Sequence, residues 1–173
     1  MKSPIISILC IVLYYTITAY PNALTSFEKH RKIITTEFKS YHISNTETIQ
    51  LYGAKQRKFL TKHTYSAEAV YGALFGERSG YLEGGIFIGQ FMRGPLDTIV
   101  DLRVFTGAGG GGSAPQGGGF IIHPTLGFGK KISSTTFIMT EIGYMQFING
   151  NISSMSIGIS INFNSWRLLE RKI

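Results

Sequence analysis

The sequence predicts an all-β fold in which eight antiparallel strands, joined in an up-and-down order, close into a barrel. Apolar and polar residues alternate with a period of two in successive segments of about ten residues. Turn residues separate these segments, and after residue 30 there is no apolar stripe with helical spacing. An even number of antiparallel strands, each joined to the next, can close a sheet and remove both of its edges. These observations together favour a barrel.

The composition limits the possible classes of protein. A chain of 173 residues has room for one domain. Apolar residues make up 43% and charged residues 16%, which excludes wholesale disorder. The single cysteine, Cys10, excludes a disulfide framework and a multi-thiolate zinc site. We expect neither a metal nor another cofactor.

The N-terminus has the pattern of a cleaved signal peptide, over residues 1–19. Lys2 precedes an apolar run over 5–17, and Ala19 is a small residue at a plausible cleavage point. The run is shorter than the ~20 apolar residues that a membrane-spanning helix needs. The sequence therefore predicts export, followed by a basic N-terminal extension over residues 20–32.

The barrel is predicted to occupy residues 33–166, with a short tail over 167–173. In the clearest segment, 154–163, Ile157 and Ile159 alternate with Ser156 and Gly158. The Asn149-Gly150-Asn151 turn joins this segment to the one before it. The eight predicted strands lie near residues 33–42, 47–59, 64–75, 81–92, 100–105, 120–129, 138–144 and 154–163.

The distribution of charge decides which face of these strands points inward. One face carries ionisable residues near the strand centres, together with glycines, whereas the other is almost free of charge in the last six strands. On a lipid-facing wall a charge costs a few kcal/mol, but a narrow lumen tolerates paired charges. We therefore expect a transmembrane β-barrel whose lumen is plugged by a polar network of Glu68, Glu83, Asp101, Arg103, His123 and Glu141. A soluble exported barrel that binds an apolar ligand in its interior is an alternative.

Strand parity also assigns the connections. With the mature N-terminus in the periplasm, the connections near 44–46, 76–80, 107–119 and 148–152 point outward, and those near 60–63, 93–97 and 130–134 point inward. Long external loops and short periplasmic turns are typical of membrane barrels. The longest predicted loop, 107–119, is external and rich in glycine. It lacks the Lys-Ser/Thr pair of a phosphate-binding loop, and its candidate surface residues are Gly109, Gly110, Gly111, Gly112 and Gln116.

Basic residues exceed acidic ones by seven (17 − 10). The excess is concentrated in one part of the chain, at Lys29, Arg31, Lys32, Lys39, Lys55, Arg57, Lys58 and Lys62, with His30 and His63 beside them. This segment could bind lipopolysaccharide phosphates or other anions at the rim, or it could simply be solvated. Nucleic acid is not an expected partner, because no nucleic-acid-binding motif is present. Lys55 and Arg57 share a strand face with Ile49 and Leu51, so a register break or a periplasmic extension is possible there.

The signal peptide, the eight alternating segments and the aromatic-ended last strand (Phe163, then Trp166) resemble small outer-membrane β-barrels of Gram-negative bacteria. The resemblance implies the outer membrane as location, its lipid and lipopolysaccharide as surroundings, and the barrel-insertion machinery as a partner. It favours a non-enzymatic protein with a structural, adhesive or surface-binding role.

An enzymatic alternative rests on His42, Ser44 and Asn45. These residues are similar to the His-x-Ser-Asn signature of outer-membrane lipid A deacylases, which are also eight-stranded barrels. That resemblance implies an esterase with Ser44 as nucleophile and His42 as its base.

Overall fold

The computed structural model describes residues 32–43, 47–76, 78–112, 119–150 and 152–164. The predicted signal peptide, almost all of the basic extension and the C-terminal tail lie outside these ranges. Within the described residues, no helix is long and apolar enough to cross a membrane.

All eight predicted strands are present, as β1 Lys32–His42, β2 Thr48–Phe59, β3 Thr64–Gly72, β4 Leu82–Arg93, β5 Thr98–Gly110, β6 Gly119–Lys131, β7 Thr136–Phe147 and β8 Ser153–Asn164. A short 3-10 turn, η2 (Pro95–Asp97), precedes β5. Two boundaries differ markedly from the prediction: β3 ends at Gly72, and β5 continues to Gly110.

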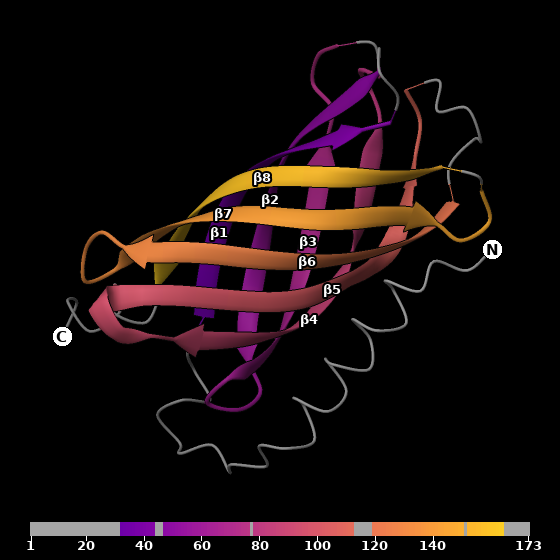
Figure 1. Ribbon diagram of the computed structural model, residues 1–173. Helices are drawn as coiled ribbons and strands as arrows, with labels where there is room; N and C mark the ends of the chain where they lie inside the picture. Colours follow the sequence, from indigo (N-terminus) through magenta and orange to yellow (C-terminus); the bar gives the residue numbers. More distant parts are fainter. Residues whose placement is uncertain (1–31, 44–46, 77, 113–118, 151, 165–173) are drawn as a thin grey trace, which may run out of the picture.

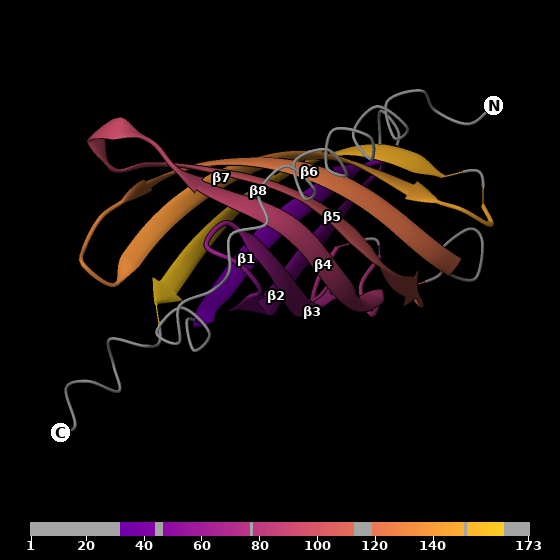
Figure 2. The same cartoon turned by 90° about the horizontal axis from the view of Figure 1, so that it is seen from below.

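The strands form one closed antiparallel barrel in sequence order. Each strand pairs with the next, and β1 closes the sheet against β8 through a register that runs from Ile33↔Asn164 to His42↔Met155. Figure 1 shows β4 to β8 curving across the front, with β1 to β3 crossing behind them. Seen from below in Figure 2, the two groups of strands lie on opposite sides of the interior. The predicted up-and-down barrel is confirmed.

Side chains alternate between the barrel's interior and its outer wall as the period of two requires. In β8 the outward residues are exposed and the inward residues are buried without exception. On β5, Asp101 and Arg103 are 0% and 1% exposed, whereas Leu102 and Val104 lie on the outer wall. The interior holds buried charges as well as apolar rings, and large aliphatic side chains are exposed on the outer wall. The alternative of a soluble barrel with an apolar interior is therefore wrong.

The connections differ in length between the two ends of the barrel. Residues 60–63, 94–97 and 132–135 join strands at the end where β1 starts and β8 finishes. The connections at the opposite end are residues 43–47, 73–81, 111–118 and 148–152. They are longer, as the sequence predicts, but the longest spans 73–81. The predicted 107–119 loop is shorter than expected because Gly107 and Gly109 pair with Gly85 and Glu83 within the sheet.

Candidate functional site

Among the residues that the structure describes, the interior of the barrel contains eight buried charged side chains, whose formal charges sum to zero. Four are cationic and four are anionic: Lys39, Lys55, Arg57 and Arg103, with Glu37, Glu83, Asp101 and Glu141. Because an unpaired buried charge is strongly destabilising, these groups must pair with one another to be accommodated. The structure shows how they do so.

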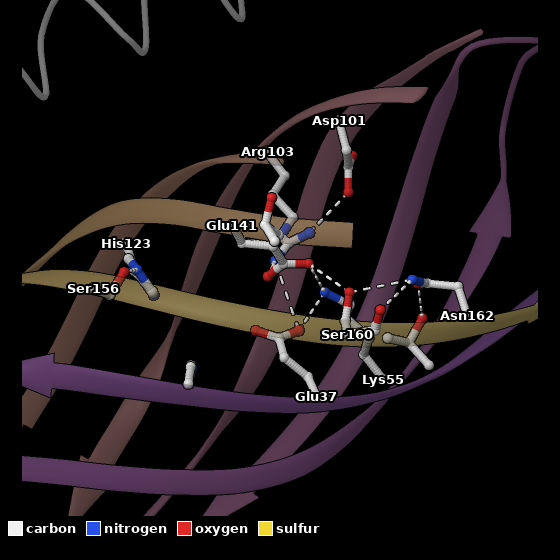
Figure 3. A network of polar contacts seen from close by, with 12 residues as sticks. Glu37, Lys55, Asp101, Arg103, His123, Glu141, Ser156, Ser160 and Asn162 are labelled. Atoms are coloured by element: carbon white, nitrogen blue, oxygen red, sulfur yellow. Dashed lines mark hydrogen bonds and ion pairs between the residues drawn. The ribbon is translucent and has the colours of Figure 1, made fainter. Parts of the chain in front are cut away.

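Arg103 and Lys55 form the centre of this network. Arg103 on β5 is paired with Glu141 on β7, and its Nη2 atom lies 3.7 Å from Glu37 on β1. Lys55 on β2 is paired with Glu37, and its ammonium also lies 3.3 Å from Glu141. Figure 3 shows these four side chains converging in the interior. Two cations and two carboxylates from four strands therefore neutralise one another.

Asp101 extends the network along β5. It accepts hydrogen bonds from Arg103 Nη1 at 2.8 Å, Arg57 Nη2 at 3.0 Å and the Tyr65 hydroxyl at 2.7 Å. The donors come from β5, β2 and β3. This carboxylate is therefore saturated by charge-assisted bonds, which are stronger than neutral ones.

Small polar side chains of β8 complete the central cluster. Ser160 donates to Glu141 at 2.9 Å, and Asn162 donates to Ser160 at 3.2 Å. Asn162 in turn accepts a bond of 2.7 Å from Thr35 on β1. The polar contacts thus cross the β1–β8 seam where the barrel closes.

A second cluster lies among Tyr41, Glu83, His123 and Ser156, with Lys39 beside it. Lys39 is paired with Glu83, which also accepts a 3.0 Å bond from the Tyr41 hydroxyl. The Tyr41 oxygen lies 3.3 Å from His123 Nδ1, and His123 Nε2 lies 2.7 Å from Ser156 Oγ. Figure 3 places His123 and Ser156 together, away from the central group.

Tyr71 connects the two clusters. Its hydroxyl donates to Glu37 at 3.1 Å, and the Lys39 ammonium lies 3.5 Å from the centre of its ring. Every strand of the barrel contributes at least one residue to the combined network, which we call the interior network.

Aromatic rings pack in the interior near the end where the chain enters and leaves the barrel. Phe91 contacts Phe59 and Phe137, with ring centroids 5.8 and 5.6 Å apart, and Phe59 contacts Tyr65 at 5.8 Å. All four side chains are buried. A layer of rings therefore lies between Arg57 and this end of the barrel.

Five of the six predicted lumen residues point inward: Glu83, Asp101, Arg103, His123 and Glu141. The prediction for Glu68 is wrong, because its side chain is exposed on the outer wall. Placing Glu68 in the lumen puts Tyr65 and Tyr71, which lie on the opposite face of β3, toward lipid. Their hydroxyls instead bond interior carboxylates, Tyr65 to Asp101 and Tyr71 to Glu37, and this reverses the expected faces of β3.

Four charged members of the network were not predicted: Glu37, Lys39, Lys55 and Arg57. The three cations had been grouped with a solvated or anion-binding basic segment, which is wrong for them because they are buried. No register break is needed in β2, since Lys55 and Arg57 share the interior with Ile49 and Leu51. The charge imbalance of the predicted lumen residues indicates that buried cations are missing from the set, because it contains four carboxylates and only one strong cation.

The other predicted site residues have separate positions. His42 is exposed at the end of β1, while Ser44 and Asn45 lie outside the described residues, so the esterase hypothesis stays a prediction. Gly109 and Gly110 belong to β5, Gly111 and Gly112 form a turn with positive φ, and Gln116 is not among the described residues. In the described part of the chain, no group of three or more His, Cys, Asp or Glu side chains is arranged to hold a metal ion.

A closed barrel whose outer wall is mainly apolar and whose interior holds paired charges is a transmembrane β-barrel, because its apolar wall can face lipid and its closed sheet leaves no unpaired edge in the membrane. Its strand number and topology are those of the small barrels of bacterial outer membranes. The class that the sequence predicts is therefore confirmed.

No protein-family model matches the sequence, and no curated protein matches it. The fold is similar to the N-terminal β-barrel domain of OprF from Pseudomonas aeruginosa, at 13% identity over 78% of this chain and 98% of that one, with a TM-score of 0.60. It is also similar to a de novo designed transmembrane β-barrel, at 7% identity over 76% and 94% of the two chains, with a TM-score of 0.54. Ail of Yersinia pestis matches at 10% identity over 77% and 97%, with a TM-score of 0.48. At these identities the likeness is one of fold.

Proposed function

We propose that this protein is a surface-binding outer-membrane protein whose barrel is an anchor rather than a conduit for ions or solutes. The observation that carries the proposal is the interior network, in which eight buried charges neutralise one another. Eight strands leave an interior just wide enough for side chains to fill.

The depth of burial supports an anchor. Arg57 and Arg103 are among the largest side chains of the barrel, yet they are essentially inaccessible to solvent. Opening a path along the axis would require these cations to leave Asp101 and Glu141. Breaking buried pairs of this kind is costly, which opposes spontaneous opening.

The 73–81 connection supports a binding role. Two backbone hydrogen bonds of 2.8 Å close its base. The Ala73 N–H donates to the Tyr81 carbonyl, and the Gly80 N–H donates to the Ala73 carbonyl. Arg78 is paired with Glu47 of the neighbouring 43–47 connection. Both connections lie at the end opposite the first and last strand termini, which faces the exterior if those termini are periplasmic.

This connection exposes two large apolar side chains directly after its base. Leu74 is 71% exposed and Phe75 is 61% exposed, although both belong to residue types that folding normally buries. A fixed base with two exposed apolar side chains beside it is suited to inserting into an apolar depression on another surface.

The proposal is tested with two measurements on the full chain. In planar lipid bilayers the purified protein should produce no steady ionic conductance, and discrete open channels would contradict the anchor. Bacteria that express the protein should attach to cultured cells and to apolar beads several-fold more than bacteria that lack it. The double variant Leu74→Ser/Phe75→Ser should lose this gain.

The matched control is the double variant Leu60→Ser/Ile132→Ser, which removes two exposed apolar side chains from the opposite end of the barrel. It should attach like the wild type. Equal attachment by all three forms, with equal amounts in the membrane, would contradict the binding role.

A further inference from the structure

The outer wall of the barrel is chemically asymmetric. From β4 to β8 its described outward residues are mainly Ile, Leu, Val, Phe and Met, and the exposed charged residues described there, Arg93, Lys130 and Lys131, lie at strand ends. The outward face of β2 and β3 is different, because it carries Gln50, Gln56, Lys58, Ser66 and Glu68. We call these five residues the polar face.

The centre of the polar face lies within the span of the strands. Gln56 on β2 is the register partner of Glu68 on β3, and the next pair along is Lys58↔Ser66. Glu68 is the fifth of the nine residues of β3, so it is far from either strand end. It forms no ion pair with any residue that the structure describes.

The wall is also hollowed at this position. A depression of about 230 Å³ is lined by polar and charged side chains of β1 to β3, with Ile86 and Ile88 of β4 at its edge; the polar and charged residues are Lys32, Gln56, Lys58, Ser66 and Glu68. Hydrocarbon chains can fill the space but cannot donate a hydrogen bond to the Glu68 carboxylate. The depression therefore suits an occupant with both polar donors and apolar surface.

We propose that the polar face is the interface through which two copies of this protein associate in the membrane. Two copies with the same membrane orientation are related by a two-fold axis along the membrane normal, and such an interface must be complementary to itself. If the axis passes between β2 and β3, each Glu68 faces the partner copy's Gln56, whose amide is a hydrogen-bond donor.

The charges favour a second copy over an anionic lipid headgroup. Lys32 and Lys58 could attract a phosphate, but Glu68 lines the same depression and would repel it. A second copy supplies a Lys58 and a Gln56 for each Glu68, so both signs of charge find a complement. This inference does not depend on the proposed role in surface binding.

Cysteine cross-linking of the full chain in its membrane tests the proposal. In a Cys10→Ser background, Ser66→Cys is treated with a short bis-maleimide. A covalent dimer of twice the chain mass should form, and adding Glu68→Leu should reduce its yield at least several-fold. Val70→Cys, on the same face of β3, replaces Ser66→Cys if that variant does not fold.

Thr140→Cys is the matched control, because Thr140 is also exposed on the outer wall but on β7. It should remain monomeric under the same treatment. Equal cross-linking at both sites, no dimer at either β3 site, or a yield unchanged by Glu68→Leu would overturn the proposal. So would an adduct that mass spectrometry identifies as another protein or a lipid.

Discussion

Arg103 on β5 and Glu141 on β7 form an ion pair in the interior although the whole of β6 separates their strands in the sheet. Such a contact is possible only because the sheet is closed and its inward side chains converge. The pair is surrounded by Lys55 and Glu37, so it belongs to a four-residue group rather than to an isolated bridge. The stability of the barrel should therefore depend on individual members of this group.

Replacing Arg103 by Met should destabilise the barrel strongly. Asp101 and Glu141 would lose their shared cation, and breaking one side of a buried pair costs about 3–5 kcal/mol. Urea unfolding in lipid vesicles, followed by circular dichroism, measures the loss. The additional change Glu141→Gln should restore part of it, because fewer unpaired carboxylates then remain. If the loss in the double variant equals the sum of the losses in the two single variants, direct coupling between the two side chains is contradicted.

Lys55 and Lys58 provide a test of strand parity within β2. Lys55 is buried and paired with Glu37, whereas Lys58 is exposed on the outer wall. Lys55→Met should lower the free energy of unfolding by several kcal/mol, of the order expected for a broken buried pair. Lys58→Met should change it by less than about 1 kcal/mol, because Lys58 lies next to the end of β2, where a lysine on the lipid face costs little. Similar losses for the two variants would contradict the assigned faces.

Gly143 should be intolerant of a side chain because of its interior position. A Cβ atom there would lie 2.5 Å from His123 Nε2 and 2.8 Å from Ser156 Oγ. Gly143→Ala should cost about 1–3 kcal/mol, which is typical of overpacking. Gly84→Ala is the matched control, because its nearest contact would be an ordinary 3.7 Å. The two unfolding midpoints should differ clearly, and identical midpoints would contradict the described packing.

The architecture was predictable from the sequence because a closed barrel imposes one simple pattern on every strand. Alternation in β8 fixes both its face and its extent, and the Asn149-Gly150-Asn151 segment marks its start. The pattern is clear where one face is aliphatic and the other is small or polar. Strand β8 fulfils this condition, whereas the inward face of β7 also carries Phe137, Met139, Met145 and Phe147.

The pattern was insufficient where one residue type can serve either face. Tyr65 and Tyr71 are large enough for a lipid-facing position, but each carries a hydroxyl that a buried carboxylate can use. Alternation alone does not distinguish these roles, and β3 was therefore assigned the wrong way round. The wrong placement of Glu68 in the interior follows directly from this assignment.

The cations of β1 and β2 were missed because a local pattern does not include charge balance. Lys39 and Arg57 are unusual within a strand until their partners on distant strands are known, and Lys55 pairs both with Glu37 on the neighbouring β1 and with Glu141 on β7. Glu83 on β4 and Asp101 on β5 are more than forty residues from the cations that they pair with. Only closure of the barrel brings these residues together.

The central claim is that aliphatic side chains face lipid while charged side chains are enclosed. Nitroxide labels at successive cysteine substitutions from Met155 to Phe163, in a Cys10→Ser background, test it directly in lipid vesicles. Labels at Ile157, Ile159 and Ile161 should collide readily with oxygen dissolved in the bilayer and poorly with a water-soluble nickel chelate, whereas labels at Ser156, Gly158 and Ser160 should be shielded from both. High exposure of the three isoleucine positions to the nickel chelate, or shielding at those positions, would contradict the account.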